Sequence, residues 1–272
     1  MKIGILGYGN MGAAMAERLK TKYQVFVFDK DPDKTKDASG LTVVKSIEEL
    51  VNSSNAIIMA VKPQDFETAL AEIKRSGSSH LVISIAAGIT TSYIEARLGK
   101  RAVIRVMPNL PAKVGAGMIC LTRGKYTTEI DLSFAQSLFN RMGVTMSVEE
   151  NMMNAVTGVS GSGPGFLYDL LNNLPRSEWD KFIREEFIPK LAYVAGQVGF
   201  NPREAAILAK NTAEGSMTLL RESKLTAVIL RVRVTSHKGT TEAGLAMLQG
   251  KIANLEAAVK AAIRRSEELS SK

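Results

Sequence analysis

The fold is decided by the stretch Ile3-Gly4-Ile5-Leu6-Gly7-Tyr8-Gly9-Asn10-Met11-Gly12. Its apolar beginning predicts a buried β-strand, and three glycines with the spacing GxGxxG lead from it into a helix-like segment. In such a turn the backbone approaches a pyrophosphate, and the helix N-terminus offers free N–H groups to it. Asp29 follows 20 residues after Gly9, at the end of the next strand-like run. The combination predicts a dinucleotide site formed by Gly7, Gly9, Asn10, Met11, Gly12 and Asp29.

Strand and helix patterns alternate up to about residue 150. Apolar, often β-branched runs predict strands at 3–6, 25–28, 56–60, 81–85, 102–106 and 145–148, and helical patterns fill 11–20, 47–51, 66–74, 92–98 and 132–142. Ser46 followed by Glu49 predicts a helix start between them. Continuously apolar strands are typical of a parallel sheet that is covered on both faces. We therefore expect an α/β fold whose residues 1–150 form a doubly wound Rossmann domain.

The second part of the chain, residues 151–272, has a helical pattern throughout and predicts an all-helical domain. Residues 202–223 predict one long helix in which Ala, Ser and Thr are interspersed with Leu and Met. Small residues on several faces allow close packing all round. Both the core of a helical bundle and a subunit interface fit this pattern.

Composition narrows the classes of protein that fit. With 45% hydrophobic and 23% charged residues, the 272-residue chain is typical of a folded protein, and its apolar runs are shorter than a membrane-spanning helix requires. The first residues run straight into a strand without the pattern of a secretion signal, so we expect a cytoplasmic protein that does not associate with a membrane. One cysteine, Cys120, lies in an apolar run, and only two histidines are present. We predict a buried thiol and no metal site.

The net charge of +8 favours anionic ligands such as a dinucleotide or a carboxylate. The basic residues are dispersed rather than clustered with aromatic residues, so we expect no nucleic-acid partner.

Further candidate residues lie where strands end or helices begin. Ala60-Val61-Lys62-Pro63 and Asn109 follow predicted strands, and ligands of open α/β sheets bind at such carboxyl ends. Residues 160–164, which begin with Ser160, and residues 236–244 predict two loops that lead into helices. Both helix N-termini suit an anion, although most such loops only cap helices.

These motifs resemble the pyrroline-5-carboxylate reductase family. The matching segments are GYGNMG, AVKP, SIAAG at 84–88, MPN, VSGSGP and VTSHKGTTEAGL at 234–245. They occur in the family's order along nearly the full chain, and the last segment is far more specific than the glycine motif.

The resemblance implies a reductase that transfers a hydride from NAD(P)H to a cyclic imine and forms proline. It also implies a helical domain that forms a homodimer or a larger ring of dimers. By resemblance, Thr241 is the catalytic hydroxyl that approaches the imine nitrogen, and Ala86 lies at the cofactor. The substrate carboxylate is expected at Ser160, Ser236, Gly239, Thr240 and Thr241.

Three departures from the family pattern bear on this interpretation. His237-Lys238 replaces the usual Pro-Gly, and an insertion interrupts the helix around residues 174–189. Asp29 stands where many members carry a polar and basic pair for the phosphate of NADPH. A carboxylate there favours the ribose hydroxyls of NADH, so we expect a modest preference for NADH.

Two alternatives remain at this level. A β-hydroxyacid dehydrogenase would carry a catalytic lysine beyond a glycine-rich loop, and residues 166–170 contain none. The other is a non-enzymatic dinucleotide-binding regulator. It is favoured by His237-Lys238 alone and disfavoured by the intact Gly239-Thr240-Thr241.

Overall fold

The computed structural model describes residues 1–77 and 79–270 and divides into two compact units. The first unit comprises Met1–Val106 and Leu121–Glu150, and the second comprises Met107–Cys120 and the chain from Asn151 onward. The second unit therefore takes one segment from within the predicted first domain.

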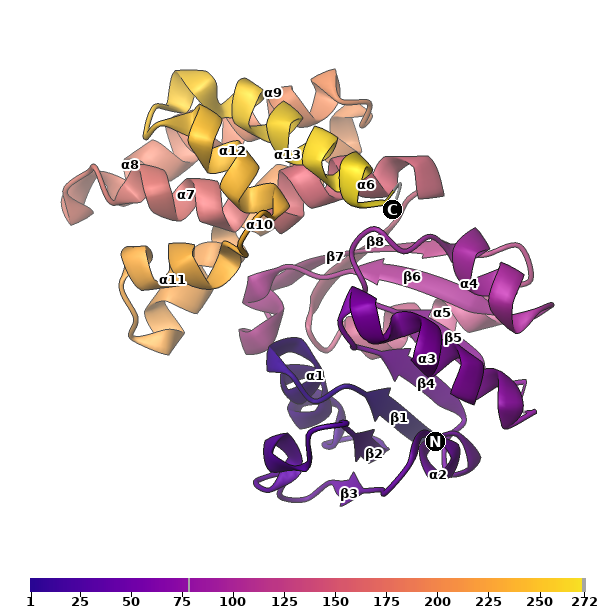
Figure 1. Ribbon diagram of the computed structural model, residues 1–272. Coiled ribbons are helices and arrows are strands. Elements are labelled where there is room, and N and C mark those ends of the chain that lie inside the picture. Colours follow the sequence, from indigo (N-terminus) through magenta and orange to yellow (C-terminus); the bar gives the residue numbers. More distant parts are fainter. Residues whose placement is uncertain (78, 271–272) are drawn as a thin grey trace. The chain divides into compact units, whose positions relative to one another are not determined.

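Across the described residues, eight strands form one sheet in the order β3-β2-β1-β4-β5-β6-β7-β8 (Figure 1). The pairs from β3 to β6 are all parallel, as the alternating pattern predicts. The strands are β1 (Lys2–Leu6), β2 (Gln24–Phe28), β3 (Thr42–Val43), β4 (Ala56–Met59), β5 (Leu81–Ser84), β6 (Val103–Met107), β7 (Gly117–Arg123) and β8 (Gly143–Ser147).

Two of these strands were not predicted from the sequence. β3 has only two residues, both exposed, which is too short to show an alternating pattern. β7 contains the apolar run around Cys120, which is completely buried. Burial raises the pKa of the Cys120 thiol far above its ordinary value, in line with the predicted structural role.

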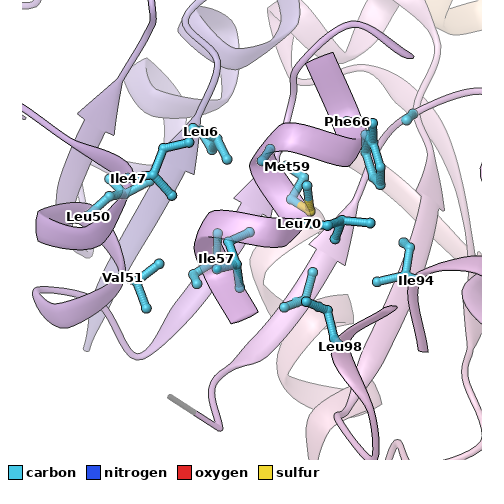
Figure 2. Packing of buried hydrophobic residues seen from close by; sticks show 14 of the residues in the cluster. Leu6, Ile47, Leu50, Val51, Ile57, Met59, Phe66, Leu70, Ile94 and Leu98 are labelled. Carbon is cyan, nitrogen blue, oxygen red and sulfur yellow. The ribbon is translucent and has the colours of Figure 1, made fainter. Parts of the chain in front are cut away.

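Helices cover the sheet, because its strands are apolar on both faces. Figure 2 shows Leu6, Ile57 and Met59 of the sheet packed against side chains of three helices, including Leu50, Phe66 and Ile94. Ile3 and Ile5 alternate with Leu6 and are completely buried as well, so the opposite face is also covered. The helices of this unit are α1 (Asn10–Leu19), η1 (Pro32–Thr35), α2 (Ile47–Asn52), α3 (Pro63–Arg75), α4 (Thr91–Leu98) and α5 (Glu129–Phe139).

The second unit is built from helices (Figure 1). The predicted long helix at residues 202–223 is confirmed as α10, which begins with an Asn201 and Glu204 capping box and Pro202 in its first turn. The helices are η2 (Leu110–Val114), η3 (Glu150–Met152), α6 (Met153–Val156), η4 (Thr157–Gly161), α7 (Gly163–Leu171), η5 (Arg176–Glu178), α8 (Trp179–Phe182), η6 (Ile183–Phe187), α9 (Ile188–Gln197), α10 (Pro202–Ser223), α11 (Ala227–Val234), α12 (Thr240–Leu248), η7 (Ile252–Asn254) and α13 (Leu255–Ser270).

The small residues of α10 are buried inside one chain. Ala209 and Ala213 are completely buried, and a Cβ on Gly215 would overlap the carbonyl oxygen of Ala116. For these positions the bundle-core interpretation is right, and the interpretation of α10 as part of a subunit interface stays a prediction.

Candidate functional site

The glycine turn after β1 has the geometry that its residues require. Gly7 has a φ of +100°, and a Cβ there would lie 2.6 Å from the carbonyl oxygen of Ala60. Its N–H donates to the carbonyl of Phe28 at 2.7 Å. A Cβ on Gly12 would overlap the carbonyl oxygen of Gly7, so only glycine allows α1 to start this close to the strand. The turn therefore brings β1, β2 and β4 together at their carboxyl ends.

The start of α1 is open to a ligand. A Cβ built on Gly9 meets no atom within 4 Å, and Gly9 caps α1 without any side-chain hydrogen bond to the first N–H groups. Free N–H groups at the positive end of a helix dipole suit a phosphate. The residues at this turn thus fit the pyrophosphate of a dinucleotide.

A cavity of about 390 Å³ adjoins this turn in the first unit. It gathers six of the residues that the sequence singles out: Gly7, Gly9, Asp29, Ala60, Val61 and Lys62. We call this space the dinucleotide cavity.

The other cofactor candidates lie elsewhere. Asn10 and Met11 begin α1, and Ala86 is buried, with its N–H bonded to the Ser84 hydroxyl at 3.2 Å. Pro63 begins α3, and its side chain lies outside the described part of the chain.

Asp29 is fixed at the rim of the cavity by three donors. Its Oδ2 accepts the Tyr8 N–H at 2.7 Å, and its Oδ1 accepts the Asp31 N–H at 2.9 Å and the Lys34 Nζ at 3.2 Å. Burial by itself would raise the pKa of the Asp29 carboxyl, but these donors outweigh burial and lower it below its ordinary value. Asp29 is therefore an oriented, ionised carboxylate at neutral pH.

Four lysines surround the same cavity, and two of them are paired. Lys30 contacts Asp65 at 2.6 Å, and Lys34 contacts Asp29. Within residues 1–77 and 79–270, Lys45 and Lys62 form no ion pair. The cavity thus presents both signs of charge to its ligand.

Lys45 and Ser46 line the cavity, although neither was predicted from the sequence to bind a ligand. The sequence pattern at these residues predicts a helix start between Ser46 and Glu49, and the structure confirms it. α2 begins at Ile47, and the Ser46 hydroxyl accepts the Glu49 N–H at 3.1 Å. The two residues do not form a full capping box, in which the Glu49 carboxylate would accept the Ser46 N–H. It accepts the Lys45 N–H instead, at 2.8 Å.

In the second unit, α12 begins at Thr240 with Gly239 as its cap, without a side-chain bond to the first N–H groups. Lys238 adopts a φ of +54°. Two bonds hold this left-handed residue in place. Its N–H donates to the Glu242 carboxylate at 2.6 Å, and its carbonyl accepts from Arg265 at 2.8 Å. The His237 side chain is 83% exposed, so it faces solvent at the rim of the loop.

Three hydroxyl groups meet where α12 and α7 begin. The Thr241 Oγ1 donates to the Ser162 Oγ at 3.2 Å, and the Ser162 Oγ donates to the Thr240 Oγ1 at 3.2 Å. The methyl group of Thr241 lies over Gly165, where a Cβ would come within 2.5 Å of it. We call Ser162, Thr240 and Thr241 the hydroxyl cluster. Ser162 lies in the segment 160–164 that the sequence analysis singles out, but it was not predicted as a site residue, because its two partners lie almost 80 residues away in the chain.

The segment before α7 corrects the loop that the sequence predicts at residues 160–164. Residues Thr157–Gly161 form a wide π-helical turn, in which the Ser162 N–H donates to the Thr157 carbonyl at 2.9 Å. The prediction fails because small residues, which are typical of loops, also permit this close helical packing. Ser160 is completely buried, and its hydroxyl donates to the Val156 carbonyl at 3.3 Å.

Asn109, a cofactor candidate, uses both ends of its amide within the second unit. Its Nδ2 donates to the Ser160 carbonyl at 3.3 Å, and its Oδ1 accepts the Met118 N–H at 3.0 Å. Ser236, a substrate candidate, is exposed and accepts the Gly239 N–H through its carbonyl at 2.9 Å.

No group of three or more His, Cys, Asp or Glu side chains in the described part of the chain is placed to hold a metal ion. No helix in the described ranges combines the length and apolar character needed to cross a bilayer.

Two family models match the chain, one in each part. Residues 2–88 match "NADP oxidoreductase coenzyme F420-dependent", and residues 185–269 match "Pyrroline-5-carboxylate reductase dimerisation". The second segment runs from η6 through α12 to α13.

Similar proteins cover the full chain. A pyrroline-5-carboxylate reductase of Synechocystis sp. is 34% identical over 100% of this chain and 99% of its own length. The enzyme of that name from Arabidopsis thaliana is 33% identical over 99% of this chain and 95% of its own length. A crystal structure of Plasmodium falciparum pyrroline carboxylate reductase with NADP bound is 26% identical, with a TM-score of 0.65 over 99% of this chain and 98% of that one. From its N-terminal parallel sheet to its C-terminal helical domain, the chain belongs to the pyrroline-5-carboxylate reductase family.

Proposed function

We propose that this chain reduces the C=N bond of 1-pyrroline-5-carboxylate and forms proline, with NAD(P)H as the hydride donor. The observation that carries the proposal is the 34% identity with a pyrroline-5-carboxylate reductase over the full chain. When bound, the nicotinamide supplies a hydride, which is two electrons and one hydrogen nucleus. The chain itself binds and orients the substrate and the cofactor, and it supplies a proton-bearing hydroxyl.

The two ends of the reaction draw on different residues. We assign the pyrophosphate to the glycine turn and the start of α1, and the ribose next to it to Asp29. The substrate carboxylate is assigned to the backbone N–H groups at the start of α12, where the helix dipole favours an anion. The Thr241 hydroxyl serves the imine nitrogen, whose charge changes as the carbon receives the hydride.

Steady-state assays with pyrroline-5-carboxylate and NADH or NADPH test the proposal, with proline as the measured product. A protein that binds the dinucleotide but forms no proline would instead support the regulator alternative. A cytoplasmic location stays a prediction from the sequence.

For the cofactor, we expect a higher kcat/KM with NADH than with NADPH. The ionised Asp29 repels the additional phosphate, and the two lysines nearest to it in sequence are already paired with carboxylates. Asp29→Ser removes the repulsion and releases Lys34, so the NADH/NADPH ratio of kcat/KM should fall by on the order of 10-fold, or ~1.4 kcal/mol.

Asp33→Ser is the matched control for that change. Asp33 lies on η1, its side chain is 73% exposed, and it pairs with Lys36 away from the cavity lining. We expect this control to keep the original ratio. A clear preference for NADPH in the unmodified enzyme would show that the lysines outweigh Asp29.

For the assembly, we propose a homodimer that is formed by the helical unit. α11 lies within the matched dimerisation segment and exposes three apolar side chains, Val228 at 40%, Ile229 at 43% and Val232 at 61%. Clustered exposed apolar residues are typical of an interface. Larger rings of dimers are compatible with this surface.

Val232→Glu should weaken self-association, because a carboxylate would then be buried without a partner. We expect the dimer dissociation constant to rise by at least about 10-fold, measured by light scattering over a concentration series. Ile130→Glu is the control, since Ile130 is 81% exposed on α5 and lies outside the dimerisation segment. A wild-type protein that is monomeric at micromolar concentration would exclude the homodimer.

A further inference from the structure

Ser162 connects two threonines that are adjacent in sequence but differ in their access to water. Ser162 is completely buried, Thr241 is 4% exposed, and Thr240 is half-buried. The hydrogen bonds run in one direction, from Thr241 to Ser162 and from Ser162 to Thr240. The hydroxyl cluster is thus a short chain of exchangeable protons that leads from a buried hydroxyl to a more accessible one.

We propose that Ser162 is a positioning residue that passes a proton from Thr240 to Thr241 during reduction of the neutral imine. The proposal rests on the proposed function, in which Thr241 faces the imine nitrogen. A hydroxyl can both donate and accept, so the two bonds can reverse together, from Thr240 to Ser162 and from Ser162 to Thr241, without leaving any of the three hydroxyls unpaired. Ser162 acts only through Thr241 and needs no contact with the substrate.

The step balances as follows. The imine carbon receives the hydride, and the electron pair of the C=N double bond moves to nitrogen. That nitrogen takes the proton of Thr241, which takes the proton of Ser162, which takes the proton of Thr240. Water returns a proton to Thr240, so the imine becomes an amine with the uptake of one proton from solvent.

The surroundings of the cluster offer no simpler proton donor. The carboxylates of the two helices that carry the cluster are engaged, because Asp169 on α7 pairs with Arg231 on α11 at 2.5 Å and Glu242 on α12 accepts the Lys238 N–H. In the described part of the chain, none of the ionisable side chains on the adjoining elements forms a hydrogen bond with the three hydroxyls. Those side chains are His237, Lys238 and Glu242 around the start of α12, Tyr168 and Asp169 on α7, Arg231 and Arg233 on α11, and Glu256, Lys260, Arg264, Arg265, Glu267 and Glu268 on α13.

The proposal predicts a defect in Ser162→Ala that depends on pH. In acid the imine arrives protonated and needs no proton during the reaction, whereas in alkaline solution the neutral imine does. The measurement is the single-turnover rate of NADH oxidation by the full-length enzyme with pyrroline-5-carboxylate. We expect Ser162→Ala to lie within about 3-fold of wild type near pH 6 and to be at least about 10-fold slower near pH 9.

The ratio of variant to wild-type rates separates this role from a structural one. The two enzymes differ only in the Ser162 hydroxyl, so their ratio at each pH reports the loss of that group. Ser216→Ala is the matched control, because Ser216 is completely buried and its hydroxyl donates only to the Thr212 carbonyl, at 2.6 Å. The ratio of the Ser216→Ala rate to the wild-type rate should not change with pH.

A second link in the chain gives an independent check. Thr240→Val removes the outer hydroxyl at nearly constant shape and should reproduce the alkaline defect, and Thr240→Ser should restore the rate. A ratio for Ser162→Ala that is constant across pH, in an active enzyme, overturns the relay and leaves the proposed function standing. A wild-type enzyme that forms no proline at any pH overturns both.

Discussion

Thr241→Ala lowers kcat by about 10- to 1,000-fold if its hydroxyl supports the imine nitrogen, as loss of one positioned donor does elsewhere. The structure gives this residue little freedom, since its methyl group lies over Gly165 and its hydroxyl is bonded to Ser162. Steady-state kinetics at saturating substrate measure the effect.

Thr241→Ser is the matched variant for this prediction. It keeps the hydroxyl and loses only the methyl contact, so it should retain much more activity than alanine. Thermal unfolding shows whether each variant is folded. Wild-type turnover in a folded Thr241→Ala enzyme would remove the proposed role.

The second large effect concerns stability rather than catalysis. Arg105 on β6 has a side chain that is only 3% exposed, and its Nη1 donates to the Glu150 carboxylate at 2.6 Å. The second oxygen of Glu150 accepts from the N–H of Thr91 at 3.1 Å and from its hydroxyl at 2.7 Å. One carboxylate therefore joins β6, α4 and the end of the first unit.

Glu150→Ala should cost about 3–5 kcal/mol in the free energy of unfolding, because it leaves a buried guanidinium without its counter-ion. Denaturant titration measures this. The control is Glu129→Ala, which breaks the ion pair with Arg123 at a site where the two side chains are 74% and 52% exposed. We expect the control to cost less than about 1 kcal/mol. Equal costs for the two variants would contradict the structural role of Glu150.

Local pattern was enough to predict most of the first unit. The glycine turn, the helix start at Ser46 and the parallel pairing of the strands all follow from backbone sterics, capping and apolar runs that lie close in sequence. The start of α10 follows in the same way from its capping box and proline. These features need no long-range contact to be recognised.

The remaining features depend on contacts between distant residues. Ser162 gains its place only when α7 and α12 come together, and Glu150 only when it reaches Arg105 and Thr91. The same limit applies to α10. From the sequence alone, its small residues fit the core of a helical bundle and a subunit interface equally well. Burial of Ala209 and Ala213 within one chain decides for the core.

The central claim is that a hydride passes from the nicotinamide to the imine carbon of pyrroline-5-carboxylate. The most direct measurement uses NADH that carries deuterium at the transferable position of the nicotinamide ring, followed by mass spectrometry and NMR of the product. We predict proline with one deuterium on the ring carbon that was the imine carbon. Oxidation of the labelled NADH without deuterated proline, or no reaction with either NADH or NADPH, would contradict the account.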